Sequence, residues 1–332
     1  MKKKIAILKN GFVENYVKAF TDLCNKNNVP CDVLDEVEES ADYEYVLTER
    51  WRTHKARCFI THVHSPFYKA KTSNIFYRTI FLLAHLPKIL KMKRNFLSAV
   101  KVFVVSRNVK QDLIANYGLA PEKVCVAYPG FIRQKDNDLE KIPKIDKDKT
   151  FNVAMSAQGF IAKGGYVMLD ALRIFRKLYP DIKIHLSIIY PKHKTNLGVK
   201  LYVKLFGLSD CVTFLGRQDN MAAYYEKADC FVCPSVYEAF GRVVVEAMYA
   251  KRPVILGSNV GAAEIVKDGA NAFVYNAGKK GAYNLAQKIK EVYDRYNDLD
   301  ELIENAYELS KTFTWENFAK QIFEGLYGKT AG

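Results

Sequence analysis

The order in which apolar segments recur along this chain limits the folds open to it. Short apolar runs suited to buried parallel strands alternate with longer segments of helical periodicity, and this alternation occurs twice. Predicted strands of the first series cover residues 4–8, 31–34, 57–61, 101–105 and 123–127, and those of the second cover 151–155, 183–189, 212–214, 230–233 and 253–256. The pattern predicts an α/β protein with two doubly wound sheets, whose ligands bind beyond the carboxyl ends of the strands.

The chain is long enough for two such domains. It has 332 residues, of which 49% are hydrophobic, so two substantial cores can form. Residues 133–150 interrupt the alternation, because they are rich in Lys and Asp and contain few large apolar side chains. We therefore expect an N-terminal domain over residues 1–145, a C-terminal domain over 146–312 and a final helical segment over 313–332.

Cysteine use and the N-terminal residues bear on the compartment. The chain has seven cysteines, an odd number, and only a short apolar run follows the lysines after Met1. We expect no secretory signal and no segment approaching the roughly 18 apolar residues of a membrane span, and hence a reducing cytoplasm. Cys230 and Cys233 fall within one predicted strand, and no second Cys or His pair follows at zinc-ligand spacing. We expect both to be buried thiols.

Residues 234–246 place two carboxylates across a strand-to-helix junction. The apolar strand before them ends at Pro234, so a loop carries Glu238 and the helix that follows carries Glu246. Glu246 is suited to accept hydrogen bonds from the vicinal hydroxyls of a ribose, which leaves Glu238 beside a sugar. Backbone N–H groups at a helix start lack an intrahelical partner and can bind a phosphate. The residues concerned are Ala239, Phe240 and Gly241.

An isolated pair of acids eight positions apart is more often an exposed loop acid and a solvated helix position. The flanking residues favour the functional interpretation, because the segment resembles the E-x7-E signature of retaining glycosyltransferases of family 4. Its elements are Pro234-Ser235, Glu238-x-Phe240-Gly241 and Glu246-Ala247. Further segments similar to this family are residues 214–216, 224–229, 253–255, 261–266, 268–269 and 314–316.

This resemblance implies the GT-B architecture, in which two Rossmann-like, doubly wound domains face a central cleft. The domain over 1–145 would bind the acceptor, that over 146–312 the nucleotide sugar, and the helix in 313–332 would cross back to the N-terminal domain. Retention at the anomeric carbon is likewise implied by the resemblance alone.

Other candidate site residues come from the same resemblance. Lys163, before a Gly pair, matches the lysine that neutralises the donor diphosphate. His64 matches the second histidine of a His-x-His-x-Pro motif that approaches the transferred sugar, and Gly11 stands near the acceptor side. Where the family places a second cation upstream of the lysine, this chain has Gln158 and Ala162. Arg217 and Arg242 are the candidates to replace it.

The first half of the chain carries a strongly basic segment. From Arg50 to Gln111 there are 14 Lys and Arg residues and no Asp or Glu, interleaved with aromatic and aliphatic side chains. A helix expected over 74–93 places several of these apolar residues on one face. The segment fits a solvated helix face, an acceptor groove for anionic glycans or lipid phosphates, or an anionic membrane surface, and we favour the last two jointly.

The function expected from these residues is transfer of a hexosyl unit from a nucleoside diphosphate sugar, with UDP favoured, to a hydroxyl of a cell-envelope glycan or glycolipid. Lys163 and the N–H groups near Gly241 would stabilise the diphosphate, and Glu238 would orient the sugar. We expect no covalent nucleophile, no metal and no cofactor beyond the co-substrate, and peripheral attachment to the inner face of the cytoplasmic membrane. Alternatives are a catalytically weak or dead nucleotide-sugar-binding subunit and a sugar-nucleotide epimerase. A nucleic-acid-binding protein fits less well, because the basic segment has no recognised binding motif, and we expect no nucleic acid as partner.

Overall fold

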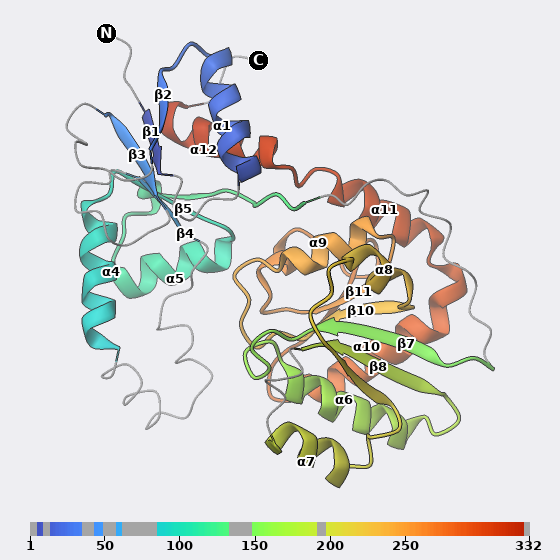
Figure 1. Ribbon diagram of the computed structural model, residues 1–332. Coiled ribbons are helices and arrows are strands. Elements are labelled where there is room, and N and C mark those ends of the chain that lie inside the picture. The colour runs from blue at the N-terminus through green and yellow to red at the C-terminus, as the bar shows by residue number, and fades with distance from the viewer. Residues whose placement is uncertain are drawn as a thin grey trace. The chain divides into compact units, whose positions relative to one another are not determined.

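The computed structural model describes residues 5–8, 14–34, 43–48, 58–61, 85–132, 148–190 and 197–328. It divides into two compact units, the first made of residues 1–131 and 313–332 and the second of residues 132–312 (Figure 1). Within the described residues, each unit holds a six-stranded sheet in which every neighbouring pair of strands is parallel. The predicted α/β class with two parallel sheets is confirmed. The units divide at Phe131, upstream of the expected boundary at residue 145.

The first unit has the strand order β2-β1-β3-β4-β5-β6. Its elements are β1 (Ile5–Leu8), α1 (Glu14–Lys26), β2 (Cys31–Leu34), β3 (Tyr45–Thr48), β4 (Cys58–Thr61), α4 (Leu86–Ser98), β5 (Lys101–Val104), α5 (Arg107–Tyr117), η2 (Pro121–Lys123), β6 (Val124–Val126) and α12 (Trp315–Tyr327).

The last helix packs into the core of the first unit. Thr314 caps α12 by accepting a hydrogen bond from the Asn317 N–H at 3.0 Å. The ring centroids of Tyr16 on α1 and Phe318 on α12 lie 5.1 Å apart. Helix α12 therefore completes the hydrophobic core of a unit whose other elements lie some 190 to 310 residues earlier in the chain.

The second unit has the strand order β12-β11-β10-β7-β8-β9. Its elements are β7 (Phe151–Ser156), α6 (Gly165–Leu178), β8 (Ile184–Ile189), α7 (Leu197–Leu205), β9 (Val212–Leu215), α8 (Met221–Glu226), β10 (Cys230–Cys233), α9 (Arg242–Tyr249), β11 (Val254–Gly257), η4 (Gly261–Glu264), β12 (Phe273–Tyr275), α10 (Gly281–Arg295), η5 (Tyr296–Asp298) and α11 (Asp300–Ser310).

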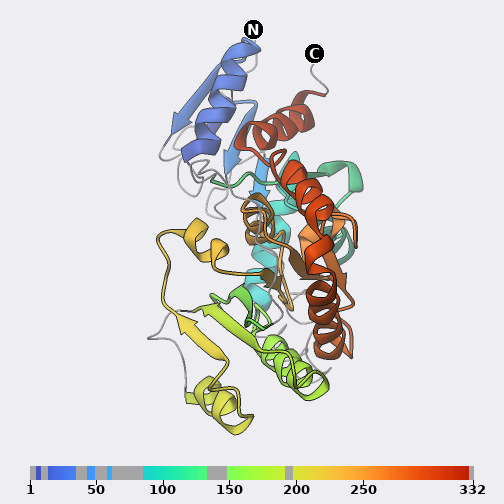
Figure 2. The same ribbon diagram turned by 90° about the vertical axis from the view of Figure 1, so that its right-hand side faces the viewer.

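The strand order of the second unit reverses between β7 and β10. From β7 the chain adds β8 and β9 on one side, and it then returns to add β10, β11 and β12 on the other. Helices α6 and α10 cover one face of this sheet, while α9 packs on the other face (Figures 1 and 2). A reversal of this kind leaves a crevice at the carboxyl ends of the two central strands, where ligands bind in doubly wound folds.

Some predicted elements differ from the observed ones. Strands β3 and β12 and helix α7 are absent from the sequence-based assignment, and the two strands have only four and three residues. The helix expected over 74–93 is observed as α4, which ends at Ser98, while residues 74–84 lie outside the described residues. Cys230 and Cys233 are free thiols buried in β10, as predicted. In the part of the chain that the structure describes, no helix has the length and apolar character needed to cross a membrane.

Candidate active site

Three loops meet at the carboxyl ends of the central strands of the second unit. They follow β7 (residues 157–164), β10 (residues 234–241) and β11 (residues 258–264). The Val236 N–H donates to the Ala162 carbonyl at 3.0 Å, and the Gly261 N–H donates to the Glu238 carbonyl at 3.1 Å. These backbone bonds join the β10 loop to the loops on both sides, so the segment predicted as a signature lies at the point where the strand order reverses.

Two glycines allow these loops to approach one another. A Cβ atom at Gly164, which has φ +71°, would lie 1.9 Å from the Pro234 carbonyl oxygen. A Cβ at Gly261 would lie 1.9 Å from the Ala239 carbonyl oxygen. Any larger residue at either position would push the β10 loop away from its neighbours.

Lys163 and Glu238 form an ion pair within this crevice, through the lysine Nζ and the carboxylate Oε2. Their side chains are 32% and 14% exposed, so the carboxylate is largely enclosed while the ammonium reaches solvent. The Ser235 hydroxyl also donates to Glu238 Oε2, at 3.5 Å. The fold thus brings together two predicted site residues from segments far apart in the chain.

Glu246 is held by a tyrosine that the sequence analysis did not assign to the site. The Tyr225 hydroxyl, on α8, donates to Glu246 Oε2 at 3.2 Å. Burial raises the pKa of the Glu246 carboxyl, while nearby Arg242 and the Tyr225 hydrogen bond act in the opposite direction. Tyr225 lies against the ring of Phe231. A tyrosine with a buried ring and a bonded hydroxyl fits this position, but no local sequence pattern connects it to a glutamate on another helix.

Asn259 was also missed by the sequence analysis. From the β11 loop, its Nδ2 donates to the carbonyls of Ser235 at 3.0 Å and Val236 at 2.7 Å. These bonds hold the backbone just before Glu238, so Asn259 fixes the loop that carries the carboxylate.

Helix α9 begins as predicted. Gly241 precedes it with φ +97°, and Arg242 is its first residue, with an exposed side chain. Ala239, Phe240 and Gly241 are all buried in this turn. Binding of a phosphate by its N–H groups stays a prediction.

The structure does not group every predicted site residue with the Lys163–Glu238 pair. Arg217 follows β9, which is separated from β7 by β8, and its side chain is exposed. Gln158 is exposed in the β7 loop, at the place where the family has a cation. Gly11 and His64 lie outside the described residues. In the described part of the chain, no group of three or more His, Cys, Asp or Glu side chains is arranged to hold a metal ion.

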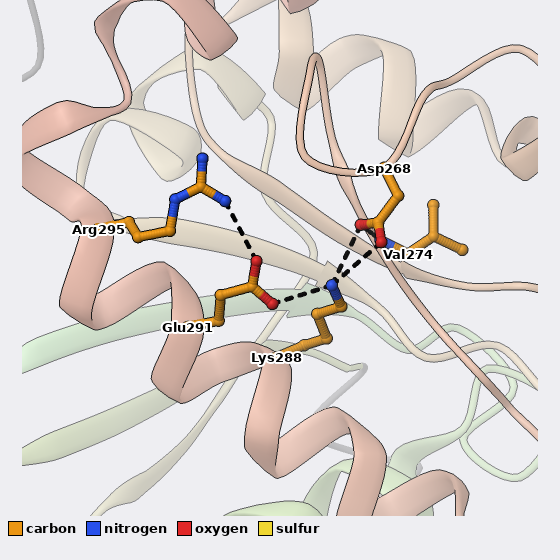
Figure 3. A network of polar contacts seen from close by, with 5 residues as sticks. All are labelled: Asp268, Val274, Lys288, Glu291 and Arg295. Carbon is orange, nitrogen blue, oxygen red and sulfur yellow. Dashed lines mark hydrogen bonds and ion pairs between the residues drawn. The ribbon is translucent and has the colours of Figure 1, made fainter.

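A second polar network in this unit is structural. Asp268 accepts from the Val274 N–H at 2.8 Å and from Lys288 Nζ at 3.2 Å, so it joins β12 to α10 (Figure 3). Lys288 also donates to Glu291 at 2.9 Å, which accepts in turn from Arg295 at 3.2 Å. Every charge of the network faces an opposite one. Asp268, in one of the segments similar to the family, thus anchors β12 to α10.

The fold defines a class of protein. Two α/β units, each built on a six-stranded parallel sheet, are the fold of GT-B glycosyltransferases. Solved structures of this class match nearly the whole chain. Anabaena HepE in complex with UDP-glucose has a TM-score of 0.67 and 18% identity, covering 98% of this chain and 100% of HepE. Sucrose-phosphate synthase from Thermosynechococcus elongatus has a TM-score of 0.69 and 17% identity, covering 98% of both chains.

Sequence comparison then gives the family. Residues 135–309, more than half of the chain, match the family described as glycosyl transferases group 1, and the chain belongs to that family. One relative is a D-inositol 3-phosphate glycosyltransferase of Paenarthrobacter aurescens, 23% identical over 232 residues. That match covers 67% of this chain and 55% of the relative, so the chain spans only about half of that protein.

Proposed function

We propose that this chain is a retaining glycosyltransferase of family 4. It would transfer a hexosyl unit from a nucleoside diphosphate sugar to a hydroxyl of a cell-envelope glycan or glycolipid. The observation that carries the proposal is the Lys163–Glu238 pair at the reversal of the strand order, on loops held together by backbone hydrogen bonds. Membership of the glycosyl transferases group 1 family supports the reaction type.

The proposed roles follow from charge and position. The diphosphate gains negative charge as the glycosidic bond breaks, and Lys163 would stabilise it together with the N–H groups before Gly241. Glu238, released from its ion pair by the donor, would orient the hexose and favour positive charge at the anomeric carbon. Glu246 would accept from the ribose hydroxyls. We assign no covalent nucleophile and no metal, and we propose that His64 and Gly11 act from the first unit.

UDP is the proposed nucleotide, and the solved complex of the structurally similar HepE with UDP-glucose supports this choice. The experiment is a thermal-shift panel of UDP-, GDP- and ADP-sugars. A ligand at 100 times its dissociation constant stabilises the folded state by about 2.7 kcal/mol. We expect UDP-sugars to give the largest shift, and the absence of a shift with every donor would contradict the proposal.

A binding subunit with little or no turnover is the second candidate function. The observation that favours it is Gln158, exposed in the β7 loop where the family has an additional cation. Donor turnover by the wild type distinguishes the two candidates, because a competent enzyme turns over the donor as it stands, whereas a subunit that lacks the cation turns it over only after Gln158→Arg supplies the charge.

We also propose that the first unit contacts the acceptor or an anionic membrane at its basic segment. Helix α4, which lies wholly within this segment, exposes Leu86, Leu90 and Leu97. Its exposed cations are Lys88, Lys91, Lys93 and Arg94. The buried residues of α4 are Ile89, Met92, Asn95 and Phe96, so the exposed leucines do not belong to the core. This arrangement supports peripheral attachment at the inner face of the cytoplasmic membrane.

A further inference from the structure

Helix α7 of the second unit presents an apolar stripe to solvent. Leu197, Leu201 and Leu205 follow one another at intervals of four residues, so they lie on one side of the helix. Their exposed fractions are 80%, 50% and 70%, and Phe206, directly after the helix, is 40% exposed. Monomeric soluble proteins rarely expose such a contiguous set, so this stripe indicates an interaction surface.

The exposed leucines are not the side of α7 that belongs to the core, because the opposite side of the helix is packed against it. Val199 and Val203 are buried against the hydrophobic core of the unit. The rings of Tyr202 and of Tyr166 on α6 meet edge to face at a centroid distance of 5.3 Å, and the Tyr202 hydroxyl donates to Asp170 at 2.6 Å. The helix is therefore anchored on α6 (Figure 1), and its three leucines are exposed to solvent.

The surroundings of the stripe are basic. Lys200 and Lys204 are exposed on α7, and the helix contains no Asp or Glu. The neighbouring acids already face cations. Asp170 pairs with Arg173 at 3.2 Å, and Asp210 pairs with Arg176 at 2.8 Å.

The charge of α7 distinguishes between two partners that such a surface could bind, a second copy of the chain and a lipid surface. In a symmetric contact between two copies of the chain, α7 would bring its own lysines into an interface to which it contributes no acid. An anionic lipid leaflet offers acyl chains to the leucines and phosphates to the lysines at the same time. We propose that α7 docks the second unit onto an anionic membrane surface.

The proposal goes beyond the contact proposed for the first unit. Helices α4 and α7 belong to different units, yet each exposes three leucines beside lysines and contains no acid. Each surface is proposed to bind an anionic leaflet on its own, without the other. Removing either helix face should therefore weaken binding without abolishing it.

The test is co-sedimentation of the full chain with vesicles of phosphatidylcholine alone and of phosphatidylcholine in which about a third of the lipid is anionic phosphatidylglycerol. We expect the wild type to bind the anionic vesicles only. The triple variant Leu197→Gln, Leu201→Gln and Leu205→Gln should lower the partition coefficient about tenfold or more, and so should Lys200→Glu with Lys204→Glu. The matched control is Lys279→Glu with Lys280→Glu, which makes the same charge change at exposed positions before α10 and should bind much more tightly than the α7 charge variant.

Several outcomes would overturn the proposal. Absence of wild-type binding to anionic vesicles would do so, as would equal binding by the wild type and the triple glutamine variant. If the α7 charge variant and its control lost equal amounts of vesicle binding, the loss would be due to net charge and not to the position of the lysines on α7. A wild-type dimer that the glutamine variant converts to a monomer, without any change in vesicle binding, would assign α7 to self-association. Light scattering measures the mass, and far-UV circular dichroism verifies that each variant is folded.

Discussion

Two ion pairs lie at opposite ends of the same sheet in the second unit, and they differ in what surrounds them. At the amino ends of the strands, Arg176 binds Asp210 through two parallel bonds of 2.9 and 2.8 Å and also donates to the Gly207 carbonyl at 2.8 Å. The Arg176 guanidinium therefore makes its hydrogen bonds to groups of the protein itself. At the carboxyl ends, Lys163 meets Glu238 through a single carboxylate oxygen.

The comparison separates a structural pair from one suited to a ligand. The bidentate Arg176–Asp210 geometry fixes the turn before β9, and the Asp210 side chain is mostly exposed. The Lys163–Glu238 pair joins two loops that approach through glycine, and its carboxylate is largely enclosed. A single-contact pair in a crevice can be opened by a charged substrate, whereas a fork-shaped pair resists exchange.

The largest expected effect is on turnover, from Lys163→Ala and Glu238→Gln. Removing one well-placed charge from a developing anion costs about 3 kcal/mol of transition-state stabilisation, so we expect turnover to fall at least about 100-fold. Donor hydrolysis and glycosyl transfer measure this directly. Asp210→Asn is the matched control, because it removes an ion pair at the other end of the same sheet and should leave turnover unchanged.

Equal turnover in the wild type and in both crevice variants would contradict the proposed mechanism. Nucleotide-sugar binding that survives while turnover is lost would locate the defect in the chemical step rather than in donor recognition.

A second prediction compares a glycine at the carboxyl ends of the strands, Gly164, with one near their amino ends, Gly207. Gly164→Ala combines a left-handed φ of +71° with overlap against the Pro234 carbonyl, so it should destabilise the fold by more than about 2 kcal/mol. Gly207→Ala has a similar φ of +61° but meets no atom within 4 Å, so it should cost only about 1 kcal/mol. Urea unfolding of the two variants separates backbone strain from loop contact. Equal losses in the free energy of unfolding would show that the close approach of the loops adds nothing to the cost of the Gly164 substitution.

A third prediction concerns Tyr225, which we place as a positioning residue for Glu246. Tyr225→Phe keeps the ring and removes the hydroxyl that bonds the carboxylate, a loss of about 1.4 kcal/mol or about tenfold in nucleotide affinity. Isothermal titration with UDP and 2′-deoxy-UDP tests the role. The wild type should prefer UDP, and the variant should lose most of this preference, whereas a purely structural change would weaken both ligands alike.

The sequence was enough for those features that depend on local pattern. The parallel α/β class follows from alternating apolar and amphipathic segments, and the helix start at Gly241 follows from the glycine after a short strand. Strand β12 was not predicted, because its three residues are too few to show a periodicity. Helix α7 was not predicted, because its valines are also typical of a strand and its glycine of a turn.

The contacts of the candidate site depend on the tertiary fold and were only partly predictable. Lys163 and Glu238 were each singled out, but their pairing arises from the strand order, which places β7 beside β10. Tyr225 lies in a segment similar to the family, but the sequence of that segment does not show that its partner is a carboxylate on another helix. Asn259 lies in no such segment, and its partners are two carbonyls of another loop. Residues that hold a site in place through such contacts become visible only when the fold is known.

The smallest expected effect is on stability, from Asp210→Asn at the amino ends of the strands. An exposed ion pair contributes about 0 to 1 kcal/mol, so the variant should lose at most that amount at pH 7 and low salt. Slight burial would raise the pKa of the Asp210 carboxyl, but Arg176 holds it below its usual range, so the pair stabilises the fold above the unfolded-state pKa. The difference from wild type should therefore shrink as the pH falls through the lowered pKa of Asp210, and it should also shrink in high salt. Urea unfolding at pH 7 and pH 3 measures it, and a loss of turnover in this variant as large as that of Lys163→Ala would remove the distinction between the two ends of the sheet.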